Sequence, residues 1–458
     1  MKNQTQTSFT VNNVPLRWRH FYIVATASLG QLIVTTVSTI AGIIIPLVNI
    51  CRHPELSGAL QGVVAAAELT GICIGSAVFG RLIDRYGYLF FYRFCPALIL
   101  LFSLIAVFVP DIAVLTVCLF MIGIGIGGEY CLDSNYVSDL SPEKYKSILV
   151  GVTKAASALG NILAAGVAFA LLADWENARM WPELMWIICG VAALMLLLRI
   201  PFHENPAWLV SKGKIDQADK AVKQFLGSDV TINPVADQTI AGRGPASVSF
   251  RQFISQNWKK VILTGVPWAC QGVGVYGIGV FLPILVMALG LEHFQAGDAP
   301  VFHVIDSVKI TLYISCIILP GFVAGLYLLN KNRKIISIQI SGFILCTLCL
   351  LLLMPAYGLH WSKWIAIATF MGFEFFLNAG PNLTTYVLPP EIYSVSDAGQ
   401  GMGIATSMGK IGAVVGVFMI PVLLKSGGAM LVLGCSSAVM ALGAVVTYAF
   451  RKERATGG

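Results

Sequence analysis

Apolar stretches of about twenty residues or more recur along nearly the whole chain, and this spacing limits the fold more than any other feature. A helix needs about 20 apolar residues to cross the ~30 Å hydrocarbon core of a bilayer. Hydrocarbon offers no partner to an unpaired backbone group, so each crossing segment is expected to be helical. The sequence therefore predicts an all-α membrane protein with twelve transmembrane helices. The predicted spans are 21–48, 57–80, 88–109, 112–138, 147–173, 183–200, 260–288, 303–329, 335–354, 362–389, 398–424 and 428–450.

Composition agrees with this interpretation. The chain has 458 residues, of which 57% are hydrophobic and 12% are charged, whereas a soluble globular protein carries about 25% charged residues. The first twenty residues are polar, and the apolar stretch after them is too long for the core of a signal peptide. We therefore expect that stretch to remain in the membrane as the first helix.

Basic residues gather on one side of the predicted topology. An even number of spans puts both termini on one side, together with the loops 81–87, 139–146, 201–259 and 330–334. Most Lys and Arg residues between the spans fall there, and the net charge is +7. Because cytoplasmic loops carry such an excess, we predict cytoplasmic termini and a place in the plasma membrane, in bacteria the inner membrane. The cytoplasmic loops then explain the net positive charge, which does not indicate that the protein binds nucleic acid. The opposite loops hold only Arg52, Arg179, Lys363 and Lys425.

The chain also contains an internal repeat, visible when the first half is shifted by 252 residues. It predicts two six-helix bundles, 1–200 and 260–458, joined by a cytoplasmic linker, 201–259, whose first part forms a short helix. A substrate site is expected between such halves, near the midplane of the membrane. The coincident positions are Gly128 with Gly380, Asp139 with Glu391, Gly151 with Gly403, and Gly160 with Gly412.

Charged residues inside the predicted spans are the main functional candidates. A charge at the centre of a helix costs about 2.5–3.5 kcal/mol on insertion scales, so it usually faces a cavity and has a partner. Glu129 and Asp133 are four residues apart and share a helix face. Asp133 and Lys154 are expected at similar depth, as an ion pair that holds two helices together. Each charge could instead serve structure alone. The candidates are Glu68, Glu129, Asp133, Lys154, Glu374 and Lys410, joined by the polar residues Gln31, Gln271, Tyr276, Asn378 and Asn382.

The segment GRLIDRYG at 80–87 resembles the signature loop of the major facilitator superfamily. Gly80, Asp84, Arg85 and Gly87 match the pattern. The resemblance implies a tight cytoplasmic turn in which Asp84 meets the N-terminus of a helix in the other half, where the helix dipole favours an anion. Such a contact would act as a latch that differs between transport states.

Further segments resemble sugar porters and metabolite:proton or phosphate:proton symporters of that superfamily. They are IGIGIGGEYCLDSNYVSDLSPEKYKS, HENPAWLVSKGKIDQADKA, VPWACQGVGVY and GPNLTTYVLPPEIY. In the first segment, Asp139 takes the place of a loop Glu and Lys146 that of a loop Arg. Glu204 matches the motif that closes the first half, and Gln271 the seventh-helix Gln that contacts substrate. With Glu391, which the repeat pairs with Asp139, these loop residues are expected to take part in gating.

The resemblance implies a secondary transporter that moves a small polar metabolite, such as a sugar, an organic acid or a similar anion, by alternating access. Lys154 and Lys410 favour an anion. Proton-coupled relatives often carry an Asp in the first helix, but Ile33 stands nearest that place, so Glu129 or Glu68 is the expected proton carrier. The alternatives are a drug or metabolite exporter and a membrane nutrient receptor without turnover. No enzymatic motif, cofactor or metal site is predicted, and a monomer in the lipid bilayer is expected.

Overall fold

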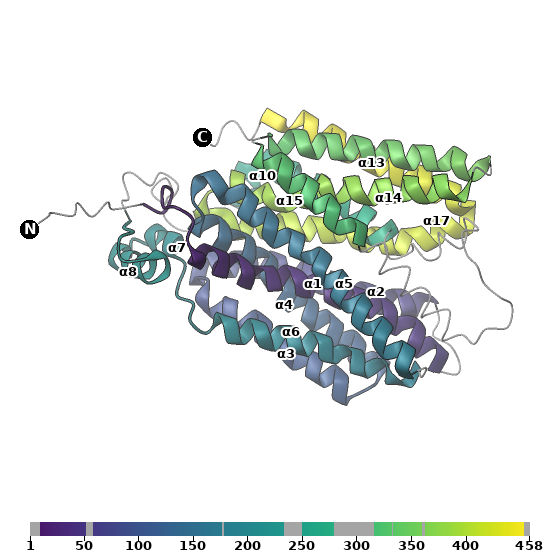
Figure 1. The fold of residues 1–458 in the computed structure, drawn as a ribbon, viewed down its shortest axis with the longest axis horizontal. Helices are drawn as coiled ribbons and strands as arrows, with labels where there is room; N and C mark the ends of the chain where they lie inside the picture. Colours follow the sequence, from purple (N-terminus) through teal and green to yellow (C-terminus); the bar gives the residue numbers. More distant parts are fainter. Residues whose placement is uncertain are drawn as a thin grey trace, which may run out of the picture.

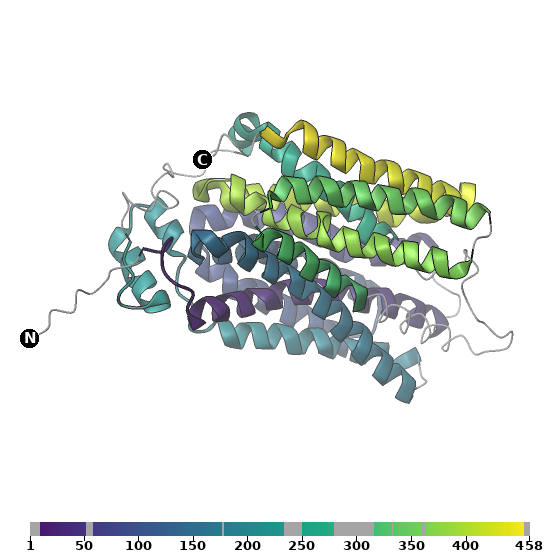
Figure 2. The same cartoon turned by 45° about the horizontal axis from the view of Figure 1, so that its top comes forward.

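The computed structural model describes residues 10–51, 58–175, 178–232, 250–278, 316–331, 333–359 and 362–452. Nearly all of this part of the chain is helical. Figure 1 shows two side-by-side groups of helices, one built from α1 to α6 and the other from α10 to α17. In the turned view of Figure 2, the second group comes forward and partly covers the first.

The first group matches the six predicted spans of the first half. Each of its six spans is long and apolar enough to cross a membrane, the sixth running from Met180 to Arg199. The short helices η1 (Glu143–Tyr145) and η2 (Ala178–Leu184) lie between the long helices. The six helices are α1 (Trp18–Cys51), α2 (Gly58–Tyr86), α3 (Leu89–Phe108), α4 (Ile112–Leu140), α5 (Lys146–Trp175) and α6 (Met185–Arg199).

The second group contains two interruptions that the sequence analysis did not predict. The predicted span 362–389 is divided at Gly380 into α14 and α15, where the backbone leaves the helical conformation. The seventh span begins as α10 and passes into a π-helical stretch, η3. The predicted spans 260–288 and 303–329 lie partly outside the described residues. The elements are α10 (Phe250–Gly272), η3 (Val273–Ile278), the helix Cys316–Asn330, α13 (Ile335–Gly358), α14 (Lys363–Ala379), α15 (Pro381–Val387), α16 (Pro389–Ile392), η4 (Val395–Asp397) and α17 (Ala398–Ala449).

The last element, α17, supplies the two final predicted spans. Its backbone is not helical at Gly427 and Gly428, and Gly428 has a φ of 65°, a conformation that glycine adopts without steric cost. Spanning segments lie on either side, at Val395–Met419 and Val422–Ala449. The predicted spans 398–424 and 428–450 are therefore confirmed.

Glycines matched by the repeat pack in equivalent places. A Cβ atom on Gly160 of α5 would lie 2.2 Å from the carbonyl oxygen of Leu32 on α1. A Cβ atom on Gly412 of α17 would lie 2.1 Å from the carbonyl oxygen of Ala269 on α10. In each half the fifth span thus presses its glycine against the first span. The predicted pair of bundles related by a repeat is confirmed, and the bundle boundaries stay a prediction.

The first part of the linker, residues 201–232, contains two helices, α7 (Pro206–Ser211) and α8 (Ile215–Leu226), where the sequence predicted one. Asn205 caps α7 by accepting from Ala207 N and Trp208 N. As predicted, α8 buries one face, which includes Ala218, Val222 and Phe225. The start of α1, the helices α7 and α8 and the end of α17 lie at one end of the molecule, hereafter the basic end (Figure 1).

Candidate functional site

Six charged and aromatic side chains from both bundles meet in the interior of the protein. All are at most 9% exposed. We refer to this group as the central charged cluster. The first bundle contributes Glu68 from α2, Tyr130 from α4 and Lys154 from α5, and the second contributes Tyr276 from η3, Tyr386 from α15 and Lys410 from α17.

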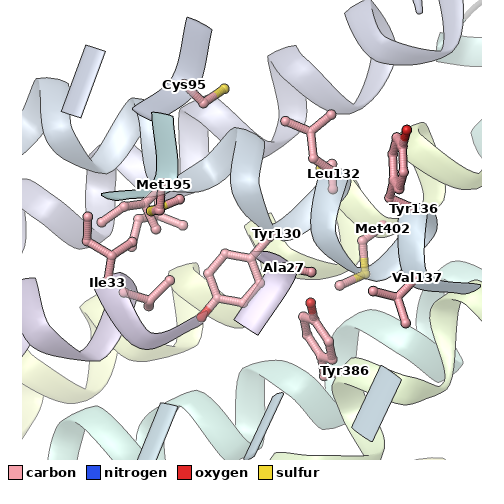
Figure 3. Close-up of a cluster of buried hydrophobic side chains, with 14 of the residues drawn as sticks. Ala27, Ile33, Cys95, Tyr130, Leu132, Tyr136, Val137, Met195, Tyr386 and Met402 are labelled. Carbon is pink, nitrogen blue, oxygen red and sulfur yellow. The ribbon is translucent and has the colours of Figure 1, made fainter. Parts of the chain in front are cut away.

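Both lysines of the cluster lie against tyrosine rings. Lys410 Nζ donates to Tyr276 Oη at 2.6 Å and lies 5.1 Å from the ring centre of Tyr130. Lys154 Nζ lies 5.6 Å from the Tyr130 ring and 5.7 Å from the Tyr386 ring. Figure 3 shows the rings of Tyr130 and Tyr386 near each other. Their centroids are 6.1 Å apart. An ammonium group over an aromatic face gains electrostatic attraction.

Glu68 is the carboxylate of the cluster, and its two oxygens each accept from Ser38 Oγ of α1 at 2.9 Å. Lys410 is within electrostatic range of Glu68 and also of Lys154. Glu68 is therefore the charge partner of Lys410, and Lys154 adds a second ammonium group beside Lys410, so that with all three groups ionised the cluster has a surplus positive charge. A buried charge without a counterion is costly, so the cluster is suited to hold an added anion.

Glu129 and Asp133 lie elsewhere, in a fully buried ion cluster with Arg199 on the far side of α4. Arg199 Nη2 is 2.7 Å from Glu129 Oε2 and 3.1 Å from Asp133 Oδ1. The guanidinium carbon also lies 3.7 Å from the ring centre of Tyr92. The expected Asp133–Lys154 pair is wrong, because Asp133 takes Arg199 as its partner and Lys154 lies over tyrosine rings. Arg199 was missed because it is the last residue of its helix, where a basic residue looks like a loop anchor.

A row of amides connects three helices of the second bundle. Gln271 Nε2 donates to Asn382 Oδ1 at 3.2 Å, and Asn382 Nδ2 donates to Asn378 Oδ1 at 2.7 Å. Asn378 Nδ2 donates to the backbone oxygen of Glu374 at 2.8 Å. Three of the predicted polar residues therefore lie together, whereas Gln31 faces the Arg199 cluster from α1.

Asp84 makes the contact that the resemblance implied. Its Oδ1 accepts from Gly399 N at 3.0 Å and its Oδ2 from Gln400 N at 2.7 Å, at the first turn of α17. The expected contact with a helix N-terminus of the other half is thus confirmed. Gly80 permits this approach, because a Cβ atom there would lie 2.3 Å from the carbonyl oxygen of Gly399. Trp208 of α7 supports the turn by donating from Nε1 to the Asp84 backbone oxygen at 2.9 Å.

Glu204 secures the other side of the same turn. It accepts from Tyr88 N at 2.7 Å and from Leu89 N at 3.2 Å, at the start of α3. Burial raises the pKa of Glu204, and the backbone N–H groups oppose that shift. Gly87 has a φ of 103° and lies against this carboxylate, so a side chain at that position would be strained and crowded.

The two acids matched by the repeat have different partners. Asp139 accepts from Asn205 Nδ2 at 3.1 Å, within the first bundle and its linker. Glu391 accepts from Ser147 Oγ at 2.5 Å, which joins α16 to α5 across the bundles. Lys146 is buried at the first position of α5, and Arg85 lies 5.1 Å from the Tyr86 ring centre. The basic end is therefore held closed by contacts from Asp84 and Glu391.

Comparisons with a family model, with known sequences and with solved structures all match this chain to transport proteins. The model of the family "Sugar (and other) transporter" matches residues 19–456. The inner membrane metabolite transport protein YgcS of Escherichia coli (strain K12) is 25% identical over 411 residues, which cover 89% of this chain and 86% of YgcS. The inorganic phosphate transporter PHO84 of Saccharomyces cerevisiae is also 25% identical over 411 residues, which cover 79% of this chain and 68% of PHO84. Among solved structures, the proton:xylose symporter XylE bound to 6-bromo-6-deoxy-D-glucose superposes with a TM-score of 0.78 at 19% identity, covering 94% of this chain and 96% of that one.

Proposed function

The chain belongs to the sugar (and other) transporter family of the major facilitator superfamily, and from this premise we propose that it moves a small anionic metabolite by alternating access, coupled to protons. The observation that carries the proposal is the central charged cluster. Each bundle supplies part of it, and substrate sites of such transporters lie where the two repeats meet. A rocking motion of the bundles changes access to a site placed there.

The charge of the cluster supports an anionic substrate. Lys154 and Lys410 are both buried, and among the described residues Glu68 is the carboxylate within electrostatic range of Lys410, so an organic acid or a phosphate would complete the charge balance. The tyrosine hydroxyls and the amide row that begins at Gln271 can supply hydrogen bonds to the polar groups of such a ligand. We assign binding to Lys154, Lys410, Tyr276, Gln271, Asn382 and Asn378.

Glu68 is the proton carrier in this proposal. It shares the cluster with Lys410, and a bound anion competes with Glu68 for the same ammonium group. Protonation of Glu68 would free Lys410 for the substrate, so that the proton and the anion are bound together. Glu129, the other carrier considered from the sequence, has both carboxylate oxygens within 2.9 Å of the Arg199 guanidinium nitrogens. This pairing leaves Glu129 poorly placed to exchange a proton with the substrate site.

The gate of the proposal is the basic end, which we place in the cytoplasm on the distribution of Lys and Arg. Asp84 at the α17 N-terminus and Ser147 with Glu391 hold the two bundles together there. Opening requires these contacts to separate, while Glu204 and Asp139 keep the turn and the linker on the first bundle. Gly80 allows the two bundles to approach closely in the closed state. In this proposal Arg85, Gly87 and Lys146 also belong to the gate at the basic end.

Ligand-induced thermal stabilisation of the purified protein tests the substrate class. A ligand at a hundredfold excess over its Kd stabilises the folded state by about 2.7 kcal/mol. We expect this from an organic acid or from phosphate, and we expect Lys410→Gln to abolish it. Lys425→Gln, which changes an exposed lysine, is the matched control and should keep it. Stabilisation by neutral sugars alone, undiminished in Lys410→Gln, would contradict the anionic assignment.

Uptake into proteoliposomes tests the coupling. Glu68→Gln keeps the shape of the side chain and removes its titration, so uphill accumulation driven by a pH gradient should vanish. Exchange between equal substrate concentrations should continue. Glu129→Gln, normalised to the amount of folded protein, should still accumulate substrate. If gradient-driven accumulation survives in Glu68→Gln, Glu68 is not the essential carrier.

A further inference from the structure

The ion cluster around Arg199 does not balance its charges. Arg199, Glu129 and Asp133 are each 0% exposed, so one guanidinium faces two carboxylates in an interior without bulk solvent. Two carboxylates in one site resist being ionised together, because each negative charge disfavours the other. An excess charge in such a place is far more costly than a neutral group. One of the two acids is therefore the natural place for a bound proton.

The geometry around the guanidinium distinguishes the two acids. Glu129 has Oε1 at 2.9 Å from Nη1 and Oε2 at 2.7 Å from Nη2, which places both of its oxygens against the positive charge. Asp133 has a single contact, from Oδ1 to Nη2 at 3.1 Å. Among the described residues, both Asp133 Oδ2 and Glu129 Oε2 are buried without a hydrogen-bond partner, but Glu129 Oε2 still lies 2.7 Å from Arg199 Nη2. Asp133 is therefore the more weakly paired acid.

A polar side chain from α1 faces this unpaired oxygen. Asp133 Oδ2 lies so close to α1 that a Cβ atom on Gly30 would be 1.9 Å from it. The next residue, Gln31, is 0% exposed and reaches toward Asp133. Within the described part of the chain, neither Oε1 nor Nε2 of Gln31 has a hydrogen-bond partner. The Gln31 amide can turn either its NH₂ group or its oxygen toward Asp133. With the oxygen turned toward Oδ2, a single hydrogen on Asp133 would satisfy both groups.

We propose that Asp133 is a proton-binding site, which carries its proton on Oδ2 and donates a hydrogen bond to Gln31 Oε1. The proton makes the cluster neutral, with Arg199 paired to an ionised Glu129. It also connects α1 to α4 and, through Arg199, to α6. This site is distinct from Glu68, and proton binding at Asp133 does not depend on whether transport is coupled to protons.

Other titratable groups around Asp133 do not supply an alternative counterion. Tyr92 and Cys95 of α3, Tyr386 of α15 and Cys131 of α4 are within electrostatic range of it. Tyrosine and cysteine side chains are neutral when protonated and negative when deprotonated. None of these four groups can therefore neutralise the charge of a second carboxylate. Among the described residues, Arg199 is the cation paired with these two acids.

Infrared spectroscopy of the purified protein tests the site directly, because a protonated carboxylic acid has a carbonyl stretch that a carboxylate lacks. The difference between wild type and Asp133→Asn should show the loss of one such band. Gln31→Leu should retain the band but shift it, since its hydrogen-bond acceptor is gone. This second variant leaves Asp133 in place, so the test does not depend on the folding of Asp133→Asn.

Thermal unfolding of the matched amide variants tests which acid holds the proton. Asparagine resembles a protonated aspartic acid, so Asp133→Asn should unfold at the Tm of the wild type. Glu129→Gln removes the ionised partner of Arg199 and should lower the Tm clearly. The reversed order would put the proton on Glu129 and overturn the proposal. An unchanged infrared spectrum in Asp133→Asn, or an unshifted band in Gln31→Leu, would overturn it as well.

Discussion

Replacement of Asp84 by asparagine should open the basic end without unfolding either bundle. The carboxylate accepts two backbone N–H groups of α17, one on each oxygen, and the side chain is 2% exposed. Asparagine has the same shape but a single acceptor oxygen, so its NH₂ group must face one of the two N–H donors. The variant therefore loses one charge-assisted hydrogen bond, the charge itself and the pairing of one buried N–H group.

The size of the effect follows from these contacts. A hydrogen bond to a charged group contributes about 1.5–3 kcal/mol, and an anion at a helix N-terminus up to about 2 kcal/mol. These contributions overlap, so a loss of about 2–3 kcal/mol from the closed state is reasonable. Since 1.4 kcal/mol corresponds to a factor of ten, the equilibrium between closed and open should shift by about 30- to 150-fold.

Distance measurement between spin labels can follow this equilibrium. Lys144 of η1 and Ser394, which precedes η4, are exposed and belong to different bundles at the basic end. They can carry the labels as cysteines once the reactive native cysteines are replaced. The distance distribution of Asp84→Asn should move toward longer separations. Asp111 provides the matched control, because it accepts from Ala113 N at 2.8 Å and Val114 N at 3.1 Å but caps its own helix, α4. Asp111→Asn should leave the distribution unchanged.

Two results would refute this reasoning. An unchanged distance distribution in Asp84→Asn, with transport at the wild-type rate, would show that the contact does not hold the bundles together. An equal change in Asp111→Asn would show that the labels report a general loss of stability.

Three further predictions concern other parts of the molecule. Gly80→Ala should impair transport, because its Cβ would lie 2.3 Å from the Gly399 oxygen, whereas Gly166→Ala, with no atom within 4 Å of its Cβ, should transport normally in the same uptake assay. Arg17 lowers the pKa of Asp229 to about 2, so their pair should hold α8 fully above about pH 4 and release it as the pH falls through about 2; amide exchange of α8 should follow this change in wild type and not in Asp229→Asn. Cysteine labelling from outside the cell should reach position 177 but not positions 240 or 456, and labelling of both of the latter would reverse the predicted orientation.

Much of the fold could be predicted because membrane spans are a property of single segments. The six helices of the first bundle and the two parts of α17 lie close to their predicted ranges. The interruptions were not predictable in the same way. Gly380 and Pro381 separate α14 from α15 where Gly380 approaches Gly342 of α13, with 2.7 Å between a Cβ atom built on one and the Cα atom of the other. A helix break that depends on contact with a neighbouring helix is only weakly indicated by the sequence of the segment in which it occurs.

The candidate site was predictable by residue type but not by partner. Burial costs alone singled out Glu68, Glu129, Asp133, Lys154 and Lys410 as charges that need a partner. Which charge meets which depends on the rotation of each helix about its axis, and that rotation is set by packing. The sequence analysis therefore paired Asp133 with Lys154 and passed over Arg199.

The sequence by itself determined the membrane class, the number of spans, the repeat and the residues that carry charge into the membrane. These features follow from hydrophobicity, segment length and composition, which act locally and do not depend on the rest of the fold. Only the tertiary structure decided that Glu68 and the two lysines share one interior while Glu129 and Asp133 share Arg199 in another. It did so because a contact between helices far apart in sequence exists only once their packed faces and relative depth are fixed.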